Sequence, residues 1–320
     1  MGLNWAEIDG TNYGNPELST EARQIASQMC VMEEAVTPAT DFALGRKSGD
    51  TVAYRLYGRI STSGTTALGE YQKVPFVDIP EYTGTGVVYR RGVAVGWTGT
   101  REDLDRLDVE STVVYNLAEH SGRTHNTLIY NQAVTDRSFA AVLTTSSNLN
   151  FTTNGTPSGT AAAPFTGWAA RQIKKNFDKY NVPKFDGAGY LGIVSPTMYY
   201  NLFDDTAASG FIDVKKYAPG GADGALRGEA GSYMSLRFTI DNHAMTDGIG
   251  SGSAYGSGMF FGADAIKEIV VYPMQLLANM NLSGDFGQQK AIAWLSFLGY
   301  KGPWNYTSHG QGTICHYTTA

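Results

Sequence analysis

Residues 49–99 form a long extended stretch with too few large aliphatic side chains to build a core of their own. Pro75 and Pro80 cannot donate to a β-ladder, which confines the middle of the stretch to a sheet edge. The first part alternates as a strand with one buried face does, with Val52, Tyr54, Leu56 and Ile60 on one side and Thr51, Arg55, Tyr57 and Arg59 on the other.

The same stretch is too long to stay within its own domain. We expect Gly84-Thr85-Gly86 to turn the chain into a return strand that ends near Trp97. A single hairpin of about 25 residues per side would reach about 80 Å, and three shorter passes about 40 Å, at ~3.3 Å per residue. A compact chain of this length has a radius of gyration near ~20 Å. Because a ribbon of two or three strands is marginally stable alone in water, we expect it to lie on a neighbouring molecule.

The composition is that of a globular, β-rich protein. Hydrophobic residues make up 42% of the 320 residues and charged residues 17%, which excludes intrinsic disorder. The net charge of −6 and the absence of any run of five basic residues argue against a protein that reads nucleic-acid sequence. The apolar stretch 291–300 is too short to span a membrane, and the N-terminus carries no secretory signal. We therefore expect a soluble protein made in a cytoplasm.

Helical and strand patterns follow one another in a definite order. Asn15-Pro16 starts an amphipathic helix that we expect to continue through Val36 and to end at Pro38. A second helix, about 50 Å long at ~1.5 Å per residue, is expected from Thr100 to Thr135, with a break at Gly122. A compact mixed region follows, in which 190–194 and 234–241 read as strands and 248–258 as a mobile loop. Strands are predicted again over 265–272, ended by Pro273, and over 288–300.

The sequence offers little for catalysis. It contains neither a GxSxG nucleophile elbow nor a GxxxxGK[ST] phosphate loop. The paired carboxylates, such as Asp103 and Asp105, are explained by the positive end of a helix dipole. Cys30 and Cys315 read as free thiols. Together with His309 and His316 they could form a soft metal site, but no CxxC or HxxxH spacing supports one, and an exposed C-terminal tail is the simpler interpretation. We expect no enzyme activity, cofactor or metal.

The order of elements resembles the major capsid proteins of tailed bacteriophages, with the Hong Kong 97-like fold, and among them most closely the family typified by phage N4. Each motif is short, and the ordered set runs over nearly the whole chain. The residues that carry the resemblance are Gly49-Asp50-Thr51-Val52, Thr100-Arg101-Glu102-Asp103, Gly192-Ile193-Val194-Ser195-Pro196, Gly228-Glu229-Ala230-Gly231, and Gly287-Gln288-Gln289 leading into Ala293-Trp294.

The resemblance implies an α+β fold with four parts. These are an N-terminal arm (1–48), an extended loop (49–99), a peripheral domain with a long spine helix (100–138 and 259–320) and an axial domain (139–258). It further implies self-assembly, as pentamers and hexamers, into an icosahedral shell around double-stranded DNA that is held without sequence specificity. The shell would form in the bacterial host cytoplasm and become the virion capsid, with separate scaffolding, portal and decoration proteins as further partners.

Polar and aromatic residues of the extended stretch are the candidate contacts between subunits. Two alternatives remain open: a nanocompartment shell of the same fold, and a β-rich glycan hydrolase or glycan-binding module, which would need convergent carboxylates in a cleft. The candidate intersubunit contacts are Arg55, Tyr57, Arg59, Lys73, Phe76, Arg90 and Arg91.

Overall fold

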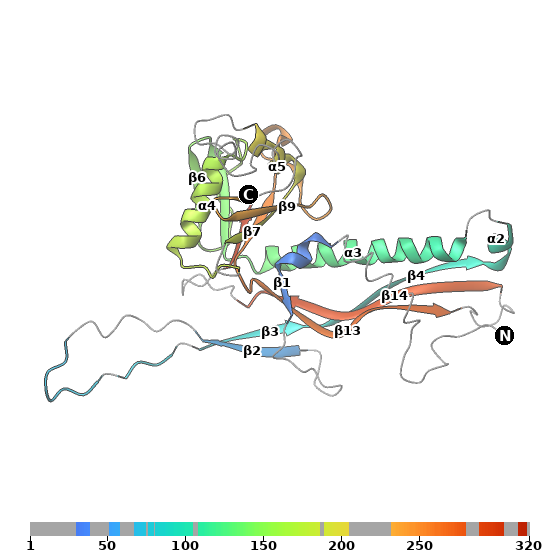
Figure 1. Ribbon diagram of the computed structural model, residues 1–320, viewed down its shortest axis with the longest axis horizontal. Helices are drawn as coiled ribbons and strands as arrows, with labels where there is room; N and C mark the ends of the chain where they lie inside the picture. Colours follow the sequence, from blue (N-terminus) through green and yellow to red (C-terminus); the bar gives the residue numbers. More distant parts are fainter. Residues whose placement is uncertain are drawn as a thin grey trace.

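A long four-stranded sheet with one helix laid along it forms the spine of the subunit (Figure 1). The computed structural model describes residues 30–38, 51–57, 67–74, 76–79, 81–104, 108–185, 189–204, 232–279, 288–303 and 313–318. The strand order is β1 (Val36–Pro38), β13 (Ile266–Asn279), β14 (Gln289–Lys301) and β4 (Tyr89–Thr98). None of the helices in these residues is both long and apolar enough to cross a membrane.

Helix α3 (Val109–Thr135) covers one face of this sheet. Its buried side chains, among them Val114, Leu117 and Ala118, pack on Ile292 and Trp294 of β14. Trp294 also donates from Nε1 to His120 Nδ1 at 3.1 Å. The fit between helix and sheet therefore rests on one large buried ring that is both packed and hydrogen-bonded.

The predicted long helix exists, but its break lies elsewhere than expected. α2 (Gly99–Leu104) and α3 are separate helices, and α3 is continuous through the buried Gly122. Asp108 provides the reason, because its Oδ1 accepts from the backbone nitrogens of Glu110 and Ser111 and so begins a new helix. Packing against the sheet outweighs the low helix propensity of one glycine.

The expectation of a helix through Val36 is wrong. Residues Val31–Ala35 form a 3-10 helix, η1, and Val36–Pro38 form β1, which pairs in parallel with the start of β13. Met32 and Ala35 are fully buried against the core, so tertiary packing decides this conformation. The earlier part of the predicted helix, residues 15–29, lies outside the described residues.

Pro273 does not end its strand. β13 continues to Asn279, and its pairing with β14 shifts in register between Val270 and Tyr272 and again between Tyr272 and Gln275. An irregularity of this kind accommodates a proline, which cannot donate a ladder hydrogen bond. The strand is consequently nearly twice as long as predicted.

A seven-stranded mixed sheet forms the second layered unit. Its core includes Phe139, Phe177, Tyr190 and Phe260, under helices α4 (Gly167–Lys179) and α5 (Pro196–Phe203). The predicted strand over 190–194 is confirmed. The strand predicted over 234–241 is shorter and runs over 236–240, because Met234 and Ser235 have positive φ and form the turn that precedes it. The strand order is β6 (Asn148–Thr152), β5 (Phe139–Thr145), β15 (Ile314–Tyr317), β12 (Gly258–Phe261), β7 (Tyr190–Val194), β9 (Leu236–Ile240) and β8 (Ser232–Tyr233).

The C-terminal segment is not an exposed tail. β15 lies between β5 and β12, and its four residues are buried. The range 259–320 was expected to belong with the spine. Strand β15 lies within it and β12 begins one residue before it, but both strands pair in the seven-stranded sheet. The reason is composition, because Ile314, Cys315 and Tyr317 have no exposed surface and fill its core.

Two glycine-rich segments also differ from expectation. Residues 247–256 form a small hairpin of β10 (Asp247–Ile249) and β11 (Tyr255–Gly256) around the 3-10 turn η2 (Ser251–Ser253). Gly250 has φ +81° and lies so close to Ala161 that a side chain would clash. Gly84–Gly86 is not a turn, since it lies inside β3 (Glu81–Val87), opposite Val52–Tyr54 of β2 (Thr51–Tyr57).

Asp136 joins α3 to the end of β14 through its ion pair with Lys301, and we predict a large loss of stability when this pair is removed. Asp136 is 2% exposed, pairs with Lys301, and accepts from Gly302 N at 2.7 Å. Asp136→Asn leaves the lysine without its counter-charge, and we expect a loss of ~3 kcal/mol in the free energy of unfolding, measured in urea. The control is Asp264→Asn, whose exposed pair with Lys267 is worth ~1 kcal/mol at most. Equal losses in the two variants would contradict this account.

Candidate interaction surfaces

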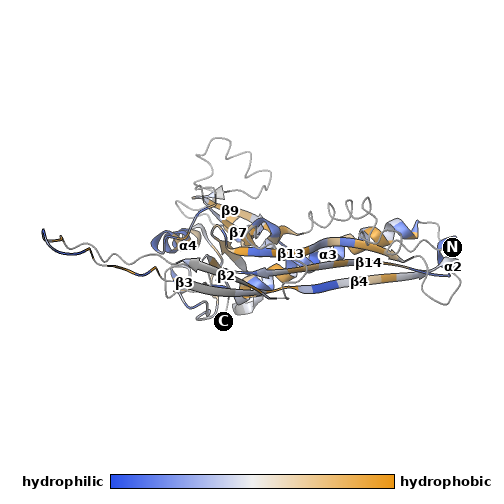
Figure 2. Cartoon of the chain, turned by 90° about the horizontal axis from the view of Figure 1, so that it is seen from below, coloured by the Kyte–Doolittle hydropathy of each residue, from blue (hydrophilic) through white to orange (hydrophobic). Residues whose placement is uncertain are grey.

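The β2–β3 hairpin projects from the subunit and carries exposed apolar side chains beyond its paired part (Figure 1). Residues 67–74 and 76–79 form the far part of this arm, and Figure 2 shows it well clear of the body, with polar and apolar residues mixed along it. Large apolar groups exposed together in this way mark an interaction surface. The exposed apolar residues of the arm are Leu68, Tyr71, Val74, Phe76, Val77 and Ile79.

The candidate contact residues fall in two places. Tyr57, Lys73 and Phe76 lie on the projecting arm, where the Phe76 side chain is fully exposed. Arg90 and Arg91 lie instead on β4, in the body of the subunit. Of the remaining two, Arg55 is placed by its backbone in β2, opposite Thr83, and Arg59 lies outside the described residues.

Arg90 and Arg91 point to opposite faces of the spine sheet. Arg91 opposes Ser296 and donates to the carbonyl oxygen of Leu298 at 3.4 Å, on the side covered by α3. Arg90 opposes Phe297 on the other side and is exposed. Only Arg90 is therefore available to a partner on the face that α3 leaves uncovered.

That uncovered face, called the open face here, is not among the contacts predicted from the sequence. Residues on it alternate with those beneath α3 and are exposed or half-exposed, although they are apolar. A strand that is apolar at both parities, as 291–298 is, indicates two covered faces, and this signal was available in the sequence. The open face comprises Ala94, Leu277, Ala293, Leu295 and, at the end where it packs on Val52 of β2 and Val88, Phe297.

The N-terminal segment Cys30–Pro38, called the clasp here, joins three parts of the subunit. Its Met32 N donates at 2.8 Å to Asn126 Oδ1 on α3, and Glu34 accepts from Thr239 Oγ1 on β9 at 3.0 Å. Asn126 is fully buried and also donates from Nδ2 to Asp241 Oδ2 at 2.9 Å. One amide thus ties the clasp, the spine helix and the seven-stranded unit together.

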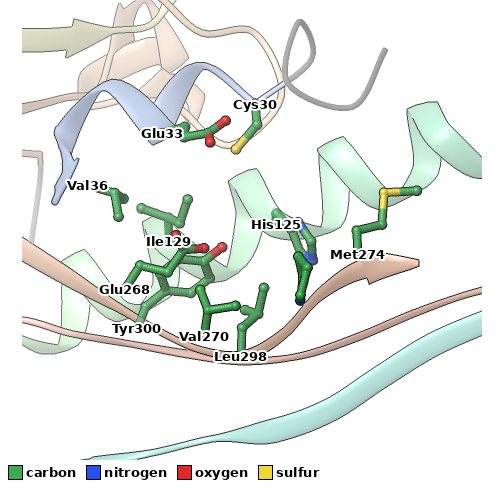
Figure 3. A pocket seen from close by; sticks show the side chains of 11 residues that line it. Cys30, Glu33, Val36, His125, Ile129, Glu268, Val270, Met274, Leu298 and Tyr300 are labelled. Atoms are coloured by element: carbon green, nitrogen blue, oxygen red, sulfur yellow. The ribbon is translucent and has the colours of Figure 1, made fainter. Parts of the chain in front are cut away.

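A cavity of about 280 Å³ lies between the clasp, α3 and the sheet (Figure 3). Burial raises the pKa of the Cys30 thiol to about 12 and lowers the pKa of His125, also beside Arg91, to about 4. Both side chains are consequently neutral near pH 7, and the thiol is unreactive. The described residues contain no group of three His, Cys, Asp or Glu that could hold a metal ion, and His309 lies outside them.

Solved bacteriophage capsid chains share this fold. The cyanophage Pam1 capsid asymmetric unit matches with a TM-score of 0.64 and 13% identity, over 91% of this chain and 93% of that chain. The capsid of cyanophage P-SCSP1u matches at 0.61 and 13%, over 89% and 86% of the two chains. The capsid of Ralstonia phage GP4 matches at 0.59 and 15%, over 90% of each chain.

No protein-family model and no curated protein sequence matches the chain. The fold is accordingly identified from the structures alone, since identities are well below 25%. It is the α+β fold of phage capsid proteins, the Hong Kong 97-like type, as the sequence predicted.

The hydrogen bonds of Asn126 lead to a prediction about how firmly the clasp is held. Asn126→Ala leaves the Met32 amide without its acceptor in the core, at a cost of ~1–3 kcal/mol, while Asp241 keeps its backbone donors His243 and Ala244. We expect faster amide hydrogen exchange across 32–37 than in the unmodified chain. Asn131→Ala, at an exposed position of the same helix, should leave the exchange unchanged. Unchanged exchange in Asn126→Ala would show that this amide does not hold the clasp.

Proposed function

We propose that this chain is a major capsid protein, whose copies assemble into the icosahedral shell around the double-stranded DNA genome of a tailed bacteriophage of the N4 type. The observation that carries the proposal is the exposed apolar arm on a capsid fold whose spine sheet has an open apolar face. The apolar arm of one copy can be buried on the apolar sheet face of another copy. Repetition of this contact over a closed shell turns modest contacts into high avidity. The role is structural, and no catalytic step is assigned.

The proposed domains follow the expected division, with one adjustment for the observed pairing. Residues 1–48 are the N-terminal arm and 49–99 the extended loop, whose last strand, β4, joins the spine sheet. Residues 100–138 and 259–320 are the peripheral domain, and 139–258 the axial domain. Strands β12 and β15 complete the axial sheet.

The arm of one subunit is proposed to lie across the open face of a neighbour. Apolar arm residues such as Phe76 would cover Leu295 and Phe297, and the exposed carboxylates Glu70 and Asp78 would approach Arg90. The sheet edge at β4 leaves a row of backbone groups that such a strand can pair with. The proposed intersubunit contacts are thus Arg55, Tyr57, Arg59, Lys73, Phe76 and Arg90, with Arg91 as an inward-facing support.

The proposed assembly consists of pentamers and hexamers and forms in the host cytoplasm. Separate scaffolding, portal and decoration proteins are proposed partners. The net charge of −6 supports weak, sequence-independent confinement of DNA, because an acidic subunit binds phosphates loosely.

The assembly state tests the proposal most simply. The purified chain, with and without a co-expressed scaffolding protein, is measured by light scattering and negative-stain electron microscopy. We expect closed shells in at least one of the two conditions. A stable monomer of 34.5 kDa in both, at all salt concentrations, would overturn the proposal. Shells that enclose a protein cargo in place of DNA in their native host would favour the nanocompartment.

A single arm substitution tests the contact itself. Phe76→Ser removes an apolar group worth ~1.5–3 kcal/mol when buried, once per subunit, and should prevent shell formation without changing the circular dichroism spectrum. Tyr115→Ser, at an exposed aromatic on the far side of α3, should assemble normally. Normal assembly of Phe76→Ser would contradict the proposed role of the arm.

A further inference from the structure

The clasp faces a second acidic residue across the cavity. Glu33 belongs to η1 and Glu268 to β13, and both line the same space (Figure 3). Figure 3 shows Glu33 with Cys30 on the clasp side and Glu268 with Tyr300 on the sheet side. The eleven residues that line the cavity include no lysine or arginine. Two carboxyl groups therefore share a partly desolvated space without a cation among its lining residues.

The other titratable groups around the cavity do not supply a positive charge to the Glu33 and Glu268 carboxylates. From α3, His125 is neutral near pH 7, and from β14 the Tyr300 phenol, its pKa raised by burial, forms a hydrogen bond with Glu268. The thiol of Cys30 is neutral as well. Asp241, on the loop after β9, adds a negative charge that acts on Cys30.

The described basic residues near the cavity are engaged elsewhere. Lys267 of β13 pairs with Asp264, and Lys301 of β14 pairs with Asp136. Arg91 of β4 is hydrogen-bonded to the carbonyl oxygen of Leu298. His243 contributes its backbone nitrogen to Asp241. No described cation forms an ion pair with Glu33 or Glu268, although the charge of Arg91 acts on His125, which lines the cavity.

We propose that Glu33 and Glu268 form a proton-sensitive latch that holds the clasp on the spine and releases it when both carboxyl groups ionise. Protonation of one carboxyl removes the repulsion and supplies a hydrogen-bond donor within the cavity. Ionisation of both places like charges across the clasp interface. The latch is a property of the single subunit and does not depend on the proposed shell.

The direction of the pH response follows from the two carboxyl groups. Burial raises the pKa of Glu33, and burial together with the charge of Glu33 raises the pKa of Glu268, both above the ordinary 4.5. A group whose pKa is higher in the folded state stabilises that state fully below its unfolded value. The contribution is lost as the pH rises from about 4.5 through the folded pKa. The clasp is thus tightest in acid and loosens toward neutral pH.

When the latch opens, the clasp loses more than one contact. Its ties to Asn126 on α3 and to Thr239 on β9 are made by Met32 and Glu34, the immediate neighbours of Glu33. Displacement of η1 therefore frees the clasp from both the spine helix and the seven-stranded unit, while the direct hydrogen bond from Asn126 to Asp241 remains. The latch makes the attachment of the clasp to these two parts depend on protonation.

Amide hydrogen exchange in the unassembled full chain tests the latch. Protection factors of residues 32–37, corrected for the intrinsic effect of pH on exchange, are compared at pH 4.5 and pH 7.5. We expect protection to fall by ~10-fold or more toward pH 7.5, because both carboxyl groups, whose pKa values are raised in the folded chain, then ionise. Glu268→Gln and Glu33→Gln should each reduce this change clearly, because the repulsion between two carboxylates is then absent and only the effect of burial on the remaining carboxyl group is left.

The matched control is Glu34→Gln, one residue away. Glu34 is bonded to Thr239 and does not line the cavity, so its pH response should equal that of the unmodified chain. The latch is wrong if Glu33→Gln and Glu268→Gln keep the unmodified response, or if protection rises with pH. Because Glu33 is a solvent-exposed residue of the clasp, we expect Glu33→Gln to fold and to stay informative even if Glu268→Gln does not fold.

Discussion

The burial of Trp294 between β14 and α3 is the interaction on which the rest of the subunit depends. This ring packs against Leu117 and Ala118, and its indole donates to His120. Removing a buried aromatic of this size costs ~3–5 kcal/mol. The arm continues directly into β4 of the same sheet, the clasp rests on the same helix, and the seven-stranded unit begins where that helix ends. The arm, the clasp and the seven-stranded unit are thus all attached to the packed pair of α3 and the spine sheet.

This packing also leaves one face of the sheet largely uncovered. A sheet has two faces, and α3 covers only one of them. The opposite face keeps Leu295 and Phe297 half-exposed, and the arm carries its apolar residues away from the body (Figure 2). Only the base of the hairpin, at Val52, packs near Phe297, so the rest of the apolar face and the far part of the arm can both be buried by a second copy.

Local patterns in the sequence predicted the elements that local physics determines. Alternation identified β2 and β9, and the helix period identified α3. The errors arose where distant partners decide. β1 exists because residues 266–268 pair with it, β15 is buried because β5 and β12 flank it, and Pro273 is tolerated by a shift in register. The cavity between Glu33 and Glu268 has no local signal, because η1 and β13 meet only in the folded chain.

The central claim is that the arm acquires its stable structure only in the assembly. Amide hydrogen exchange of residues 67–79, followed by mass spectrometry in the free subunit and in purified shells, tests it most directly. The account predicts exchange within seconds in the free subunit and protection of ~100-fold or more in shells, as strand pairing and burial require. Equally fast exchange in both states would contradict it.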